Sequence, residues 1–127
     1  MKLRIKGDSL RLRVSRSEVA KLLDGECLEE TIHFTPDAGA KFTFALQSEN
    51  SISRPAVQYA GNKVTVMIPA GPANAWGTTD QVGIAEDISL GSRGSLALLI
   101  EKDFACLDRS DESNDDTFPN PNAGSTC

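Results

Sequence analysis

Lysine and arginine side chains recur at alternate positions near the start of the chain, and their type and spacing indicate a chemistry. Over residues 2–14 they alternate with apolar residues, which is the pattern of strands with one charged face. Such a row can contact nucleic-acid phosphates, because arginine presents paired donors and lysine a point charge. The candidate nucleic-acid-binding residues are Arg4, Lys6, Ser9, Arg11 and Arg13.

The same basic residues also fit a simpler interpretation, the solvated outer face of a sheet whose charges discourage edge-to-edge pairing. The row contains no aromatic side chain, so it offers no platform on which single-stranded bases would stack. The two interpretations differ in whether the positive charge stays free of carboxylates in the folded chain. Neutralisation of the arginines by Glu29, Glu30 or the acidic C-terminal residues would favour a protein-interaction module over nucleic-acid binding.

Charge is distributed unevenly along the chain. Its 13 basic and 18 acidic residues give a formal net charge of −5. Residues 1–23 hold seven bases and two acids, or +5, so the remainder has 13 − 7 = 6 bases and 18 − 2 = 16 acids, or −10. We expect the whole chain to repel nucleic acid at long range while one patch attracts it.

The other reactive side chains assemble no catalytic or metal-binding motif. His33 is the only histidine and lies between two apolar residues of an expected strand. Cys27, Cys106 and Cys127 are odd in number and widely spaced, which fits neither a disulfide framework nor a zinc site. Cys27 and Cys106 are expected in the core. We therefore predict a protein that is not an enzyme and that holds no metal and no cofactor.

The elements that position the basic row follow from periodicity. Alternation of apolar and polar residues predicts strands, and a change to helical spacing after a capping box predicts a short helix. In order, the expected elements are strands 2–6 and 10–14, a helix over 15–24, strands 27–34 and 41–47, strands 57–59 and 63–68, a helical segment 69–76, and strands 81–89 and 95–102. The predicted fold class is mainly β with two short helices, a pseudo-two-fold ββαββ repeat that forms a small barrel.

A shift of the sequence by 54 residues, without a gap, tests this repeat. It gives 13 apolar pairs in the 44 columns of residues 3–46, where independent placement at 39% apolar content gives roughly 7. Leu22 falls opposite Trp76, which is expected to be a core anchor. A plain meander of short strands is the alternative. Two columns break the correspondence: Ile32 with Glu86, and Glu30 with Ile84.

The repeat defines one barrel domain over residues 1–107, with half-repeats at about 1–48 and 55–102. Because two such halves bury each other's apolar faces, we expect a monomer that is an internal pseudo-dimer. Residues 108–127 are acidic with few apolar anchors, which predicts a flexible tail, or one that covers the domain through Phe118.

Apolar runs are short throughout the chain. None approaches the roughly 20 residues of a membrane span, so no membrane partner is expected. The first residues alternate charged and apolar side chains, unlike the continuous apolar stretch of a secretory signal. We expect a cytoplasmic protein.

A glycine turn, Gly7-Asp8-Ser9, joins the two basic strands and is followed by a capped helix and a strand hairpin, while the second half contributes Val66-Met67-Ile68-Pro69-Ala70. These features resemble the AbrB/MazE type of swapped-hairpin module. Members of that family are usually homodimers, so residues 1–102 resemble a dimer fused into a single chain. The whole chain also resembles uncharacterised small bacterial proteins that open with Lys-Leu-Arg-Ile-Lys-Gly, which implies no function.

The AbrB/MazE resemblance implies double-stranded DNA as a partner, bound through the basic strands, with transcriptional regulation as the outcome. It places Arg4 and Arg13 at basic strand positions and Ser9 at the serine of the family's Gly-Asn-Ser turn. Asp8 replaces the neutral asparagine of that turn, and Met67 stands where the second half would carry its arginine. A symmetric reader of palindromic DNA needs both basic strands, so we expect one-sided binding.

The alternative function is a protein-interaction module, antitoxin-like or a decayed family member, that does not bind DNA. The acidic remainder of the chain and the second half's lack of basic residues favour this alternative.

Overall fold

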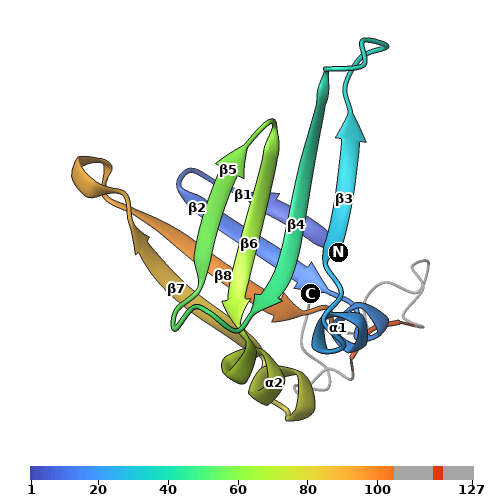
Figure 1. The fold of residues 1–127 in the computed structure, drawn as a ribbon, viewed down its shortest axis with the longest axis vertical. Helices are drawn as coiled ribbons and strands as arrows, with labels where there is room; N and C mark the ends of the chain where they lie inside the picture. The colour runs from blue at the N-terminus through green and yellow to red at the C-terminus, as the bar shows by residue number, and fades with distance from the viewer. Residues whose placement is uncertain (105–115, 119–127) are drawn as a thin grey trace.

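The computed structural model describes residues 1–104 and 116–118, and its elements follow the order of the expected repeat (Figure 1). The first half contains β1 (Lys2–Ile5), β2 (Ser9–Val14), α1 (Arg16–Leu23), β3 (Leu28–His33) and β4 (Lys41–Glu49). The second half contains β5 (Ala56–Ala60), β6 (Lys63–Pro69), α2 (Ala70–Thr78), β7 (Gly83–Ser89), the short 3-10 turn η1 (Gly91–Arg93) and β8 (Ser95–Lys102). The prediction of a mainly β protein with two short helices is confirmed.

The strands form two four-stranded sheets, and each sheet takes one hairpin from each half. Sheet A has the order β1-β2-β8-β7, and sheet B has the order β3-β4-β6-β5. The halves meet in the middle of each sheet as a parallel pair, β2 with β8 and β4 with β6, while the outer pairs are antiparallel. Exchanging the two halves converts one sheet into the other, as a pseudo-two-fold relation requires.

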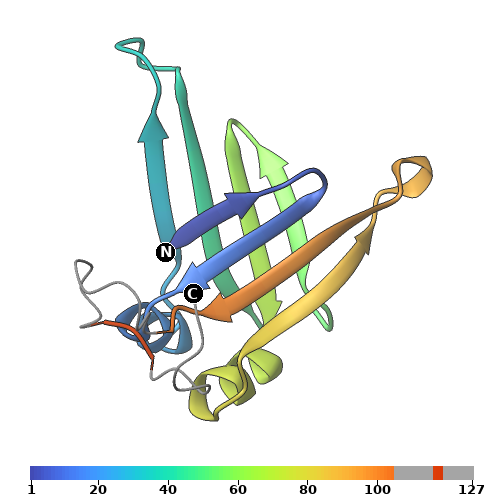
Figure 2. The same cartoon turned by 180° about the vertical axis from the view of Figure 1, so that it is seen from behind.

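The two sheets lie one on the other and are not closed into a single barrel. No strand pair joins sheet A to sheet B within the described residues. Figures 1 and 2 show the sheets crossing, with both helices at the end where the strands converge and the hairpin tips diverging at the other end. The barrel expected from the sequence is therefore replaced by two layers, because β1, β3, β5 and β7 each pair on one side only.

The core lies between the sheets at the end that the helices cover. Leu12 and Val14 from β2 are fully buried with their repeat equivalents Val66 and Ile68 from β6. Trp76 of α2 is also fully buried, and its Nε1 donates a hydrogen bond of 3.0 Å to the carbonyl of Val82. Burial of each such side chain stabilises the fold by about 1.5–3 kcal/mol. The expectation that Trp76 anchors the core is met.

Helix α1 begins where its sequence predicts. The Ser15 hydroxyl accepts a hydrogen bond from the amide of Glu18, and the Glu18 carboxylate accepts one from the amide of Ser15, which completes the capping box. Helix α2 has no side-chain cap and begins after Pro69. The two helices pack closely because Gly77 has no side chain: a Cβ there would lie 2.6 Å from Cδ1 of Leu23.

The third strand of the second half is displaced by two residues, which explains the broken columns of the repeat. Leu28 pairs with Leu46, whereas Ile84 pairs with Ile100, although Leu46 and Ile100 are 54 residues apart. Strands β3 and β7 therefore correspond at an offset of 56, which places Ile32 opposite Ile88. The loop after β7 (residues 90–94) is two residues shorter than the loop after β3 (residues 34–40), so the offset returns to 54 in the fourth strand.

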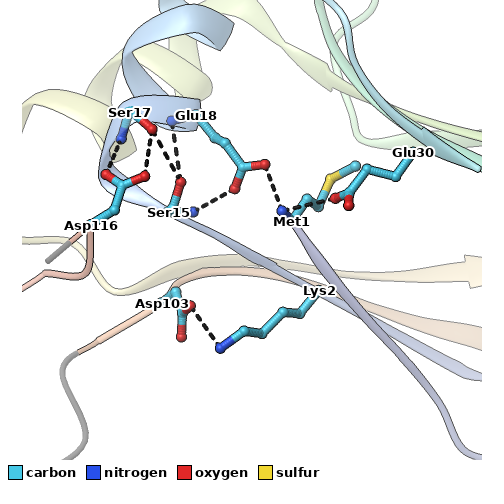
Figure 3. A network of polar contacts seen from close by, with 8 residues as sticks. All are labelled: Met1, Lys2, Ser15, Ser17, Glu18, Glu30, Asp103 and Asp116. Atoms are coloured by element: carbon cyan, nitrogen blue, oxygen red, sulfur yellow. Dashed lines mark hydrogen bonds and ion pairs between the residues drawn. The ribbon is translucent and has the colours of Figure 1, made fainter. Parts of the chain in front are cut away.

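Ion pairs link the edges of the two sheets where hydrogen-bonded strands would close a barrel. The amino group of Met1, at the start of β1, contacts Glu18 and lies 2.9 Å from Glu30 on β3 (Figure 3). At the opposite edges Arg54, before β5, lies 2.8 Å from Glu86 on β7. Glu30 and Glu86 are equivalent in the repeat, so each half joins the entry to its first strand to its own third strand.

Two further expectations concern Cys27 and the C-terminal tail. Cys27 is exposed, so its expected place in the core is wrong; it precedes β3, an edge strand whose residues after Leu28 are all exposed. Residues 116–118 lie beside α1 (Figure 2), where Asp116 accepts hydrogen bonds from the amide and hydroxyl of Ser17. The rest of the predicted flexible tail, with Cys127, lies outside the described residues, as does Cys106, which is also expected in the core.

Substitution of Gly83 tests the tight register of β7 against β8. A Cβ at Gly83 would lie 2.7 Å from the carbonyl oxygen of Ile100, which is backbone and cannot rotate away. We expect Gly83→Ala to lower the free energy of unfolding by about 1–3 kcal/mol in urea titrations followed by Trp76 fluorescence. Gly71→Ala is the control, because a Cβ meets no atom there and alanine favours a helix. Equal effects of the two substitutions would contradict this packing.

The pH dependence of stability tests the Met1 network. Burial opposes both charges, but the contacts with Glu18 and Glu30 raise the pKa of the Met1 amine above its usual 8.0, and the contacts with Met1 and Ser15 lower the pKa of Glu18 below its usual 4.5. The contribution of the Met1 amine to stability is therefore fully present below pH 8.0 and is lost as pH rises through its raised pKa. The contribution of Glu18 to stability is fully present above pH 4.5 and is lost as pH falls through its lowered pKa.

We expect stability to fall on both sides of this window and Glu18→Gln to reduce both losses. Free energies of unfolding measured across pH provide the test. Glu26→Gln, which replaces an exposed glutamate outside the network, should leave both losses unchanged. Identical pH profiles for wild type and Glu18→Gln would rule out this role of the network.

Candidate nucleic-acid interface

The basic residues of β1 and β2 gather on the outer face of sheet A, which faces the viewer in Figure 2. Along β2 the residues Leu10, Leu12 and Val14 are buried, so the alternate residues Arg11 and Arg13 point outward. The antiparallel register with β1 places further cations beside them, because Arg4 pairs with Arg11 and Lys2 pairs with Arg13. The predicted alternation thus produces two cross-strand pairs of cations on one surface, which we call the basic face.

Like charges directly opposite each other repel, and two carboxylates from the end of the chain's second half offset part of this repulsion. Glu101 on β8 pairs with Arg13 in the parallel register, and its Oε1 lies 2.9 Å from Nε of Arg13 and 3.5 Å from Nε of Arg11. Asp103 lies 3.1 Å from Nζ of Lys2. One side of the basic face is therefore neutralised.

The other side of the basic face remains positive. Arg4 and Lys6 are exposed, and no carboxylate of residues 1–104 or 116–118 lies within ion-pair distance of either. Both line a shallow hollow of about 260 Å³ with Ser9 and Arg11. The Ser9 hydroxyl donates to the carbonyl of Lys6 at 2.7 Å, so it holds the turn that presents these cations.

A second hollow continues the surface along the hairpin. It has a volume of about 240 Å³ and is lined by Lys2, Leu3, Arg4, Arg11 and Arg13. The two hollows share Arg4 and Arg11. The five candidate residues predicted from the sequence are therefore brought together on one surface, with Arg4 and Arg11 at its centre and Arg13 beside a carboxylate.

The equivalent face of sheet B carries almost no positive charge. Gln58 and Thr65 stand where sheet A has Arg4 and Arg11, and Met67 stands where it has Arg13. Lys41 and Lys63 are the cations that the described residues place there, and Nζ of Lys63 lies 2.7 Å from Glu29. The charge that could meet phosphates is one-sided, as the sequence comparison of the two halves predicts.

Glu29 and Glu30 are engaged away from the arginines, and the acidic residues of segment 108–115 lie outside the described residues. Glu29 binds Lys63 and Glu30 binds the Met1 amine, so neither contacts the arginines. Glu101 neutralises the arginines, and the sequence signal for it is weak, because its contact with Arg13 follows from a parallel pairing between segments 88 residues apart. No local pattern reveals such a pairing.

The described residues do not form a metal centre. Within residues 1–104 and 116–118, no group of three or more histidine, cysteine, aspartate or glutamate side chains could hold a metal ion. His33 is exposed at the end of the edge strand β3.

Removal of the Glu101 carboxylate tests the charge balance of the basic face. We expect Glu101→Gln to lower the free energy of unfolding by about 1 kcal/mol at low salt, because Arg11 and Arg13 then face Arg4 and Lys2 without compensation. Added salt screens this repulsion and should reduce the difference. Urea titrations at two salt concentrations, with Glu26→Gln as control, measure it. A loss of stability that does not depend on salt would contradict the electrostatic explanation.

No curated protein and no solved structure matches this chain. In the described part of the chain, no helix is long and apolar enough to cross a membrane. These findings leave the AbrB/MazE resemblance as a prediction.

One family model does match. It covers residues 1–122, which include both halves of the repeat and the segment that lies beside α1. The chain therefore belongs to DUF7009, a family of unknown function.

Proposed function

We propose that this protein is a non-catalytic binding protein whose basic face binds the phosphates of double-stranded DNA, as a regulator of the AbrB/MazE type would. The observation that carries the proposal is the group of Arg4, Lys6 and the half-buried Arg11 around one hollow, with Arg4 and Lys6 exposed and free of ion pairs to the described carboxylates. A cation that no internal carboxylate holds is available to an external phosphate. The proposed location of this DNA-binding protein is the cytoplasm.

The neighbouring carboxylates determine the form of this binding. Glu101 and Asp103 lie at one end of the basic face, so the phosphates approach at the hairpin end, near Lys6 and Arg4. Sheet B supplies no second basic face, and DNA contacts are therefore made from one side of the molecule. A single-sided surface reads charge and groove shape more than the symmetry of a palindrome.

The resemblance to AbrB/MazE-type modules supports the same proposal through a separate argument. It matches Arg4 and Arg13 to basic strand positions that contact DNA in that family. The departure at Asp8 adds a negative charge in the turn beside Lys6. We expect this charge to weaken binding relative to a module with a neutral asparagine.

Fluorescence anisotropy of labelled duplex DNA, generic and from a random library, tests the proposal. We expect affinity to fall steeply with salt, with a slope of about −0.9 in log K against log salt for each phosphate neutralised. Arg4→Ala/Arg11→Ala should weaken binding and make this slope shallower by about 2. Both substituted side chains lie on the surface, so the fold should persist.

The matched control is Lys41→Ala/Arg93→Ala, which removes the same charge from exposed positions outside the basic face. This control separates the basic face from net charge, because both variants lower the charge of the chain by two. Equal loss of DNA affinity in both variants would show that net charge, and not the basic face, determines DNA binding. Failure of wild type to bind at low salt would exclude the DNA proposal.

A second candidate, the protein-interaction module, is supported by a different surface. The side chains of Ile32, Phe34 and Tyr59 are 49%, 64% and 65% exposed, respectively. Ile32 and Tyr59 lie on the inner face of sheet B, near hairpin tips that extend past sheet A in Figure 1. Exposed apolar groups of this size fit the apolar surface of a protein partner. DNA binding that is undetectable at low salt would favour this candidate.

A further inference from the structure

Lys102 is the buried charged side chain of the described residues. It ends β8 on the inner face of sheet A, two residues after the fully buried Ile100, and only 4% of its surface is exposed. Its Nζ donates a hydrogen bond of 2.6 Å to the carbonyl of Thr79 and lies 5.1 Å from the centre of the Phe118 ring. An ammonium group removed from water is costly unless charge and hydrogen bonds compensate for it.

The described residues only partly compensate for the burial of the Lys102 charge. No carboxylate of residues 1–104 or 116–118 lies within ion-pair distance of Lys102, and Asp80 acts on it only from further away. Burial lowers the pKa of Lys102 below its usual value, and the charge of Asp80 opposes this shift. An ammonium group can donate three hydrogen bonds, and the Thr79 carbonyl accepts one of them. Lys102 therefore has donor capacity left for an anion.

An open cavity lies beside Lys102 between the two helices and the C-terminal segment. Its volume is about 710 Å³, within the range of small-molecule sites. Its walls are largely apolar: α1 contributes Val19, Ala20 and Leu23, and the rings of Phe104 and Phe118 contribute an aromatic edge. The cavity is on the inner, helix-covered side of the molecule and shares no lining residue with the hollows of the basic face.

Charge in the lining selects the kind of ligand. Arg16 and Lys102 are the cations that line the cavity, and Asp80 is the carboxylate, so the lining has one net positive charge. A ligand with one negative charge balances it, and an apolar body fills the space between the helices and the aromatic rings. We propose that this cavity binds a small organic carboxylate with an apolar body, whose carboxylate accepts hydrogen bonds from Lys102.

A comparison of a charged and a neutral probe distinguishes an anion-binding site from a cavity that binds apolar molecules only. Hydrocinnamate and hydrocinnamyl alcohol have the same aromatic body and differ in the carboxylate, so their affinities for the full chain isolate the contribution of charge. We expect hydrocinnamate to bind at least about tenfold more tightly in NMR titrations, because a hydrogen bond to a charged donor is stronger than a neutral one. Equal affinities, or no binding of either probe, would overturn the proposal.

Two variants test whether the preference for hydrocinnamate over the alcohol arises in this cavity. Lys102→Met keeps the apolar stem and removes the charge, so the preference for hydrocinnamate should disappear while the alcohol still binds. Asp80→Asn removes the lining carboxylate at an exposed position, so the preference should increase. A preference that survives in Lys102→Met, or that falls in Asp80→Asn, would contradict the assignment. The second variant keeps the test valid if the first does not fold.

The basic face provides the remaining control. Arg4→Ala/Arg11→Ala should leave hydrocinnamate binding unchanged, because neither residue lines this cavity. A loss of hydrocinnamate binding in that variant would place the anion on the basic face and overturn the cavity proposal. Failure of DNA binding would leave the cavity proposal intact, since the two tests use different residues.

Discussion

The exchange of hairpins between the two halves determines the rest of the structure. Each half has one hairpin in each sheet, and the parallel pairs β2·β8 and β4·β6 hold the sheets together from their centres. Neither half could complete a sheet or bury Trp76 and Leu22 without the other. The same exchange brings Glu101 of the second half beside Arg13 of the first and places Lys102 at the cavity that both helices line. Charge balance on the surface and in the cavity therefore depends on the exchange.

The halves are alike inside and different outside. Inward positions keep their apolar character, as in Leu12 with Val66, because both halves fill one core. Outward positions are free of this constraint: Arg11 on sheet A corresponds to Thr65 on sheet B. The difference between these equivalent outward positions is therefore not a requirement of folding. The proposed DNA binding rests on the outward residues of the first half alone.

Local periodicity was sufficient to predict the elements but not their partners. The alternation of Leu10, Leu12 and Val14 with arginines gave the buried and charged faces of β2, and Ser15 and Glu18 gave the start of α1. The displacement of β7 was not predictable, because a gapless shift cannot contain two extra residues before that strand and a loop two residues shorter after it. Contacts from distant segments, such as Glu101 with Arg13, depend on tertiary pairing, and burial of Lys102 depends on how two helices and a C-terminal segment meet.

Chemical-shift mapping on the labelled full chain tests the central claim that DNA phosphates meet the outer face of sheet A. Addition of generic duplex DNA at low salt should shift the amides of β1, β2 and their turn, with the largest changes near Arg4, Lys6 and Arg11. The amide chemical shifts of residues on the outer face of sheet B should not change, because Lys63 on that face is paired with Glu29. Shifts confined to the β3–β4 hairpin, or none anywhere, would contradict the account.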